Sequence, residues 1–124
     1  LRLFIPRSYS NMLRCGITED YTMGYPDEPG FRAGIARPFF FYDAERDEQL
    51  QIKVFPLQVM DATLYQYRKL DPETAGKVIS GLIAETRKAG GIFISLWHNT
   101  SLLESDEWQG WRTVFENMLE EQRT

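Results

Sequence analysis

The residue with the clearest capacity for chemistry is His98, the single histidine of the chain. It follows residues 92–97, an apolar run that begins after Gly90-Gly91 and ends before Asn99. Such a run is typical of a strand buried on both faces of a parallel sheet, and α/β proteins place their chemistry where such strands end. An imidazole can exchange a proton near neutral pH, so this position is the best single clue to function, although it is not sufficient alone. The alternative is a structural histidine that hydrogen-bonds to loop backbone.

Composition excludes several classes of function. The chain has 124 residues, enough for one modest domain, and 43% hydrophobic with 26% charged residues describe a folded globular protein. Its net charge of −4 argues against nucleic-acid binding. No apolar run approaches the roughly 18 residues of a membrane span. With one Cys and one His, the chain cannot form an internal disulfide or an ordinary zinc site of three or four N/S ligands.

Apolar periodicity and turn residues predict the elements that must position His98. We expect a helix at residues 6–14, strands at 17–23, 31–35 and 50–54, a helix from Pro72 to just before Gly90, a strand at 92–97 and a final helix at 105–122. Residues 24–30 read as a loop, 38–42 as an edge or irregular segment, and 57–70 as a loop with Asp61 followed by a possible short helix. The last helix should bury one face, formed by Trp108, Trp111, Phe115, Met118 and Leu119.

Helices interleaved with buried strands indicate an α/β fold, either layered or a barrel. The first five residues lie within an apolar segment, so we expect a fragment. Residues 1–124 then form a single domain that is part of a larger barrel. The cellular location stays open, with the cytoplasm favoured.

Five short motifs, in order, resemble the later half of polysaccharide deacetylase-like proteins, above all a bacterial subgroup of them. The resemblance covers nearly the whole chain. The motifs are GITEDYTMGY at 16–25, GFRAG at 30–34, PF at 38–39, MD at 60–61 and LWHN at 96–99.

This resemblance implies the C-terminal half of a distorted (β/α) barrel and the metal-dependent removal of acetyl groups from N-acetylated sugars. In the family, an Asp and two His from the earlier half hold the metal, usually zinc, and a second Asp is the general base. None of these is visible here. The expected cofactor is therefore zinc or another divalent metal bound by residues outside this chain. The expected partners are a carbohydrate substrate and either a second copy or the missing N-terminal half.

The resemblance also assigns roles to three residues. His98 matches the general acid that protonates the leaving amine. Arg32 matches the arginine that orients the catalytic Asp, a task that suits a bidentate guanidinium; a surface arginine is the alternative. Asp61 corresponds to a late acidic residue that pairs with or positions such groups, or else it caps a helix that starts at Ala62.

Four more residues are candidates for the substrate side. Trp97 and Leu96 could line an apolar wall beside the acetyl methyl, although one of them should belong to the strand core. Asp20 and Tyr25 lie near a strand end and a loop, which makes them candidates for sugar contacts.

Three interpretations follow. The first is the C-terminal portion of a deacetylase-like hydrolase that supplies the general-acid side of the pocket and is inactive alone. The second is a catalytically inactive carbohydrate-binding or scaffold domain of the same fold. The third is a free-standing α/β interaction module.

Overall fold

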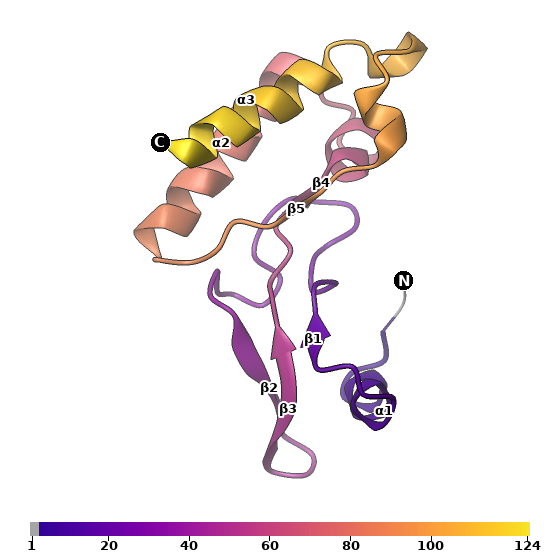
Figure 1. Ribbon diagram of the computed structural model, residues 1–124, viewed down its shortest axis with the longest axis vertical. Coiled ribbons are helices and arrows are strands. Elements are labelled where there is room, and N and C mark those ends of the chain that lie inside the picture. The colour runs from indigo at the N-terminus through magenta and orange to yellow at the C-terminus, as the bar shows by residue number, and fades with distance from the viewer. Residues whose placement is uncertain (1–2) are drawn as a thin grey trace.

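The computed structural model describes residues 3–124. Its first layer is a three-stranded sheet with one helix, drawn at the bottom of Figure 1. The helix is α1, Arg7–Arg14, and the strands are β1, Glu19–Asp20, β2, Phe39–Asp43, and β3, Glu48–Val54. β3 lies in the middle, parallel to β1 and antiparallel to β2.

The two faces of this sheet differ because the sequence of β3 alternates. Leu50, Ile52 and Val54 are buried in a cluster that includes Tyr9 of α1, as the predicted period of two requires. Lys53 points to the opposite face and pairs in register with Phe40 of β2, which is exposed. Helix α1 therefore covers one face only.

The second layer is a β-α-β-α unit in the upper half of Figure 1. It contains β4, Val59–Met60, α2, Pro72–Lys88, β5, Ser95–Leu96, and α3, Trp111–Arg123. β4 and β5 pair in parallel, with α2 as the connection between them. The predicted mixed α/β class is therefore confirmed. The strands of residues 3–124 form two small sheets and do not close into a barrel.

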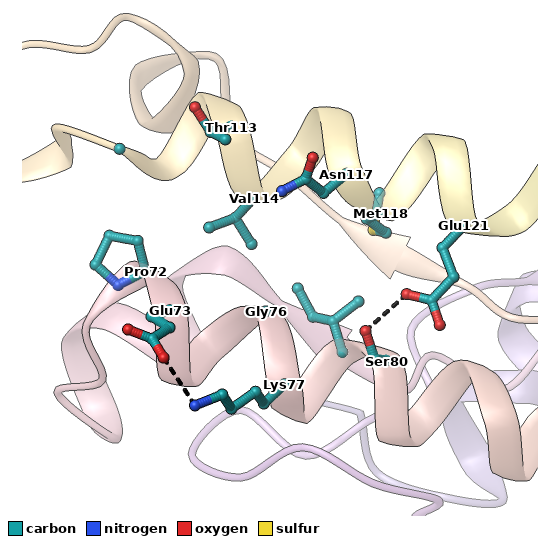
Figure 2. A pocket seen from close by; sticks show the side chains of 12 residues that line it. Pro72, Glu73, Gly76, Lys77, Ser80, Thr113, Val114, Asn117, Met118 and Glu121 are labelled. Carbon is teal, nitrogen blue, oxygen red and sulfur yellow. Dashed lines mark hydrogen bonds and ion pairs between the residues drawn. The ribbon is translucent and has the colours of Figure 1, made fainter.

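Helices α2 and α3 lie side by side and run in the same direction (Figure 1). Figure 2 shows the groove of about 510 Å³ between them, where Ser80 of α2 donates a hydrogen bond of 2.7 Å to Glu121 of α3. Glu73 and Lys77 form an ion pair on the α2 side. No residue that the sequence proposes for the site lines this groove.

The larger core lies beneath these two helices and against β4. Its buried members are all apolar, and they are Val59, Leu64, Ala75, Ile79, Ile83, Trp108, Trp111, Val114 and Met118. Burying one such aliphatic side chain contributes about 1.5–3 kcal/mol.

Helix α2 starts at Pro72, as predicted. Asp71 accepts a hydrogen bond of 2.9 Å from the backbone N–H of Thr74, and Pro72 occupies the first helical position. The expected short helix within residues 57–70 is also present, as a π-helix at Thr63–Tyr67. It begins two residues after Asp61.

Three predicted strands were wrong in extent or in kind. Residues 17–23 contribute only β1. Residues 31–35 form a turn, in which Gly34 has φ of +71° and its N–H donates to Phe31 O.

Residues 92–97 contribute only β5 and are not buried on both faces, since Ile92 is 49% and Leu96 40% exposed. The Gln58 side chain takes the place of a strand partner there. Its Oε1 accepts from Ile94 N, and its Nε2 donates to Ile92 O at 3.4 Å.

The final helix starts later than predicted. A 3-10 turn at Asp106–Trp108 precedes it, and Gly110, with φ of +87°, separates the turn from α3. Leu119 was expected on the buried face and is 39% exposed. Among residues 3–124, no helix has the length and apolarity needed to cross a membrane.

Candidate functional site

The candidate site is centred on Asp61, which directly follows β4. Asp61 is 1% exposed, and a buried carboxylate is costly unless donors surround it. Its Oδ1 accepts from Ala62 N at 2.6 Å and contacts His98 Nδ1 at 2.7 Å. Its Oδ2 accepts from His98 N at 2.7 Å and from Ser101 Oγ at 2.5 Å. Both oxygens thus have two partners each, so this carboxylate lies inside a saturated network.

The parallel register of β4 and β5 brings His98 to Asp61. Met60 pairs with Leu96, so the residues that follow each strand leave the same edge of the sheet. An ionised carboxylate only accepts hydrogen bonds; a neutral His98 therefore carries its proton on Nδ1 and presents the Nε2 lone pair. The side chain is 52% exposed. The pair is an oriented acid–base group with one nitrogen accessible.

Ser101 is a member of this site that the sequence analysis did not identify. It lies on a 3-10 turn, Asn99–Leu102, immediately after His98, and is 0% exposed. Its Oγ is also 2.7 Å from the carbonyl oxygen of His98. The only signal in the sequence was a serine three residues after a candidate histidine, which is too common to stand out.

A hollow of about 550 Å³ adjoins the two strands that lead to this pair, although neither Asp61 nor His98 lines it. Met60 and Leu96, the last residues of β4 and β5, form part of its wall. The rest is mostly apolar or aromatic, and it consists of Leu3, Tyr21, Thr22, Gly24, Tyr25, Pro26, Arg32 and Leu57. No carboxylate belongs to this lining.

Arg32 and Tyr25 meet at this hollow, as their loop positions allow. Arg32 donates a hydrogen bond of 3.1 Å to Gly24 O, and its guanidinium lies 6.0 Å from the centre of the Tyr25 ring. Among residues 3–124, Arg32 forms no ion pair within 4.0 Å.

Asp20 lies at the end of β1 but is turned inward and is 4% exposed. Its Oδ2 accepts from the Tyr9 hydroxyl at 2.8 Å and its Oδ1 from the Thr22 hydroxyl at 2.6 Å. Burial, and then the hydrogen bond to Asp20, raise the pKa of Tyr9 above its ordinary value. This arrangement joins α1 to β1. Thr22, whose hydroxyl donates to Asp20, is also one of the residues that line the hollow.

The side chains of Leu96, at the end of β5, and Trp97, the next residue, point in different directions, as those of successive residues in an extended chain do. The Trp97 ring packs edge-on against Phe115 of α3, with ring centres 5.2 Å apart, and borders the larger core. Leu96 lines the hollow. Of the two, Leu96 is therefore the one in position to contact a ligand there.

The residues of this site do not fit a zinc centre. Within residues 3–124, no three side chains of His, Cys, Asp or Glu come together as a set of metal ligands. Zinc in proteins takes three or four such ligands. We therefore derive no chemical step through a metal from this chain.

Comparisons with protein-family models, with curated proteins and with solved structures give no match to this chain. The functional argument consequently rests on the geometry above and on the sequence motifs.

Proposed function

We propose that this chain forms the general-acid side of a hydrolase pocket that removes acetyl groups from N-acetylated sugars. The observation that carries the proposal is the contact of 2.7 Å between Asp61 Oδ1 and His98 Nδ1, together with the half-exposed imidazole. A buried carboxylate behind an accessible imidazole is the arrangement of a general acid–base pair. The resemblance to polysaccharide deacetylases adds the reaction and the substrate class.

In this proposal His98 acts at the step in which the amide breaks. Water adds to the acetyl carbonyl carbon, the C–N bond cleaves, and the departing nitrogen takes a proton from Nε2 of protonated His98. The products are acetate and the free amine of the sugar. Asp61 stabilises the imidazolium before transfer and keeps Nε2 directed outward. The group that activates the water and any divalent metal would come from residues outside this chain.

The hollow lined by Met60 and Leu96 supports the same proposal. Leu57, Met60 and Leu96 offer an apolar surface for a methyl group, and Tyr21 and Tyr25 are 47% and 38% exposed. Tyrosine rings present an apolar face with a hydroxyl at the edge, which suits a sugar ring. The acetyl group would then lie against Met60 and Leu96, close to His98.

The architecture supports a larger barrel of which this chain is one part. The face of the three-stranded sheet opposite α1 exposes Phe40, Tyr42 and Tyr21 at 44%, 52% and 47%. Exposed aromatic side chains on a sheet with open edges mark a surface for further pairing. We propose that a second copy of this chain or the remaining half of a distorted barrel covers this face.

The test is acetate release from N-acetylated oligosaccharides by the protein expressed from its complete gene, with and without added Zn²⁺. His98→Gln keeps the size and polarity of the side chain but removes its acid function, so we expect at least a hundredfold loss of kcat. The matched control is Gln109→His, which adds an imidazole elsewhere on the surface. Equal rates for His98→Gln and the unchanged protein would refute the role of His98.

A carbohydrate-binding domain without catalysis is the second candidate, and the exposed tyrosines of the hollow favour it. It predicts that oligosaccharide binding depends on Tyr25 and is indifferent to His98→Gln. Binding of this kind, with no acetate release in the presence of Zn²⁺, would replace the first proposal by the second.

A further inference from the structure

We propose that Ser101 is a positioning residue: it fixes the rotation of the Asp61 carboxylate and thereby holds His98 in the Nδ1–H tautomer, with Nε2 free for the substrate. The inference deepens the proposed function, because it says how the acid–base pair is kept ready. It does not depend on which substrate is cleaved.

Four hydrogen-bond contacts surround the Asp61 carboxylate. Two donors are backbone N–H groups, of Ala62 on Oδ1 and of His98 on Oδ2, and neither can reverse its direction. The other two are side chains, His98 Nδ1 on Oδ1 and Ser101 Oγ on Oδ2. Among residues 3–124, Ser101 is thus the only side chain besides His98 that contacts this carboxylate through a hydrogen bond.

Ser101 is itself held in place by contacts with the His98 carbonyl. Its backbone N–H donates to the His98 carbonyl at 3.2 Å, and its Oγ lies 2.7 Å from the same oxygen. The residue that carries the imidazole is therefore tied to Ser101 through its carbonyl and to Asp61 through its N–H and ring. These contacts close a small ring of hydrogen bonds in which each member restrains the others.

Removal of the Ser101 hydroxyl takes one of the two partners away from Asp61 Oδ2. Without it, Oδ2 keeps only the backbone N–H of His98, and the carboxylate can rotate away from the imidazole. The contact between Asp61 Oδ1 and His98 Nδ1 then weakens. In a free imidazole neither nitrogen is held by a partner, so both tautomers become populated and the stabilisation of the protonated ring by Asp61 declines.

The chain offers a direct readout because His98 is its single histidine. The ring C–H and ¹⁵N signals in NMR spectra belong to this residue and need no further assignment. Among residues 3–124, Asp61 is the one carboxylate within 4 Å of the ring nitrogens. The tautomer of the ring therefore reports mainly on the Asp61 contact.

The experiment compares Ser101→Ala with unchanged protein in this 124-residue chain. We expect the ¹⁵N shifts of the unchanged protein to show the Nδ1–H tautomer almost alone. In Ser101→Ala we expect a mixture of tautomers, because the contact between Asp61 Oδ1 and His98 Nδ1 no longer holds the proton on one nitrogen. Ser101→Thr, which keeps the hydroxyl, should restore the tautomer. The matched control is Ser95→Ala, whose hydroxyl contacts Met118 Sδ instead and should leave the ring signals unchanged.

Ring ¹⁵N shifts in Ser101→Ala that equal those of the unchanged protein would overturn the proposal. If Ser101→Ala does not fold, Ser101→Cys keeps the volume with a weaker donor, and unchanged ring signals in that variant would overturn it equally. In the active protein we expect Ser101→Ala to lower kcat about tenfold with little change in KM, at the lower end of losses seen when the partner behind a working histidine is removed. NMR changes without any acetate release would leave the role of Ser101 standing and refute the deacetylase.

Discussion

Replacement of Asp61 by Asn tests whether the saturated carboxylate network stabilises the fold. The substitution preserves shape and replaces one carboxylate oxygen by an NH₂ group. If this group takes the place of Oδ1, it faces the N–H of Ala62; if it takes the place of Oδ2, it faces the N–H of His98. Because a backbone N–H cannot become an acceptor, either orientation loses at least one hydrogen bond and sets two donors against each other.

The magnitude follows from the burial of Asp61, which is 1% exposed. A hydrogen bond to a charged group contributes about 1.5–3 kcal/mol, and a buried donor left without a partner costs about 1–3 kcal/mol. Both ranges describe the same lost hydrogen bond, so the two free energies are not added. We therefore expect Asp61→Asn to lower the free energy of unfolding by about 2–3 kcal/mol, a large part of the about 5–15 kcal/mol typical of a domain.

Urea unfolding followed by tryptophan fluorescence measures this change, because Trp97, Trp108 and Trp111 all lie in or beside the larger core. With a denaturant slope of about 1–3 kcal/mol/M, the midpoint should fall by about 0.7–3 M. The matched control is Asp27→Asn, the same substitution at an exposed loop position, which should change stability by less than about 0.5 kcal/mol. An Asp61→Asn variant as stable as the Asp27→Asn control would refute the reasoning.

Two further predictions concern a helix cap and the exposed sheet face. Hydrogen bonds from the backbone N–H groups of Gly110 and Arg112 lower the pKa of Glu104 below its ordinary 4.5. The stabilisation by Glu104 is therefore present above pH 4.5 and is lost as the pH falls through the lower pKa of the folded state. In thermal unfolding, Glu104→Gln should lose less stability than the unchanged protein between neutral and acidic pH, and identical pH profiles would contradict this. Sedimentation of the 124-residue chain should show self-association that Phe40→Ser weakens, since Phe40 is 44% exposed on the uncovered face, while a monomer at all concentrations would count against that surface.

Local sequence determined the elements whose signals lie within a few residues. Asp71 and Pro72 specified the start of α2 because a cap and a fixed φ act on the adjacent turn alone. The alternation in β3 specified which side chains face α1 because the strand period is a local property. These predictions needed no knowledge of distant parts of the chain.

Sequence reasoning failed where a distant group changed the local outcome. The apolar residues 92–94 read as a buried strand, but the side chain of Gln58 accepts and donates the hydrogen bonds that a strand partner would have used. Residues 105–110 read as helix, and the left-handed backbone at Gly110 separates them from α3. Neither the identity of the partner nor the sign of that dihedral angle is encoded in hydrophobic periodicity.

For the candidate site, the sequence by itself placed His98 at the end of an apolar run, and the resemblance pointed to Asp61 within a loop. The sequence could not determine that they meet, because they lie 37 positions apart and each has a plausible local role. The tertiary structure decided this through the parallel register of Met60 with Leu96, which directs both residues to one edge of the sheet. The tertiary structure also determined the role of Ser101, because only the fold places its hydroxyl beside the Asp61 carboxylate.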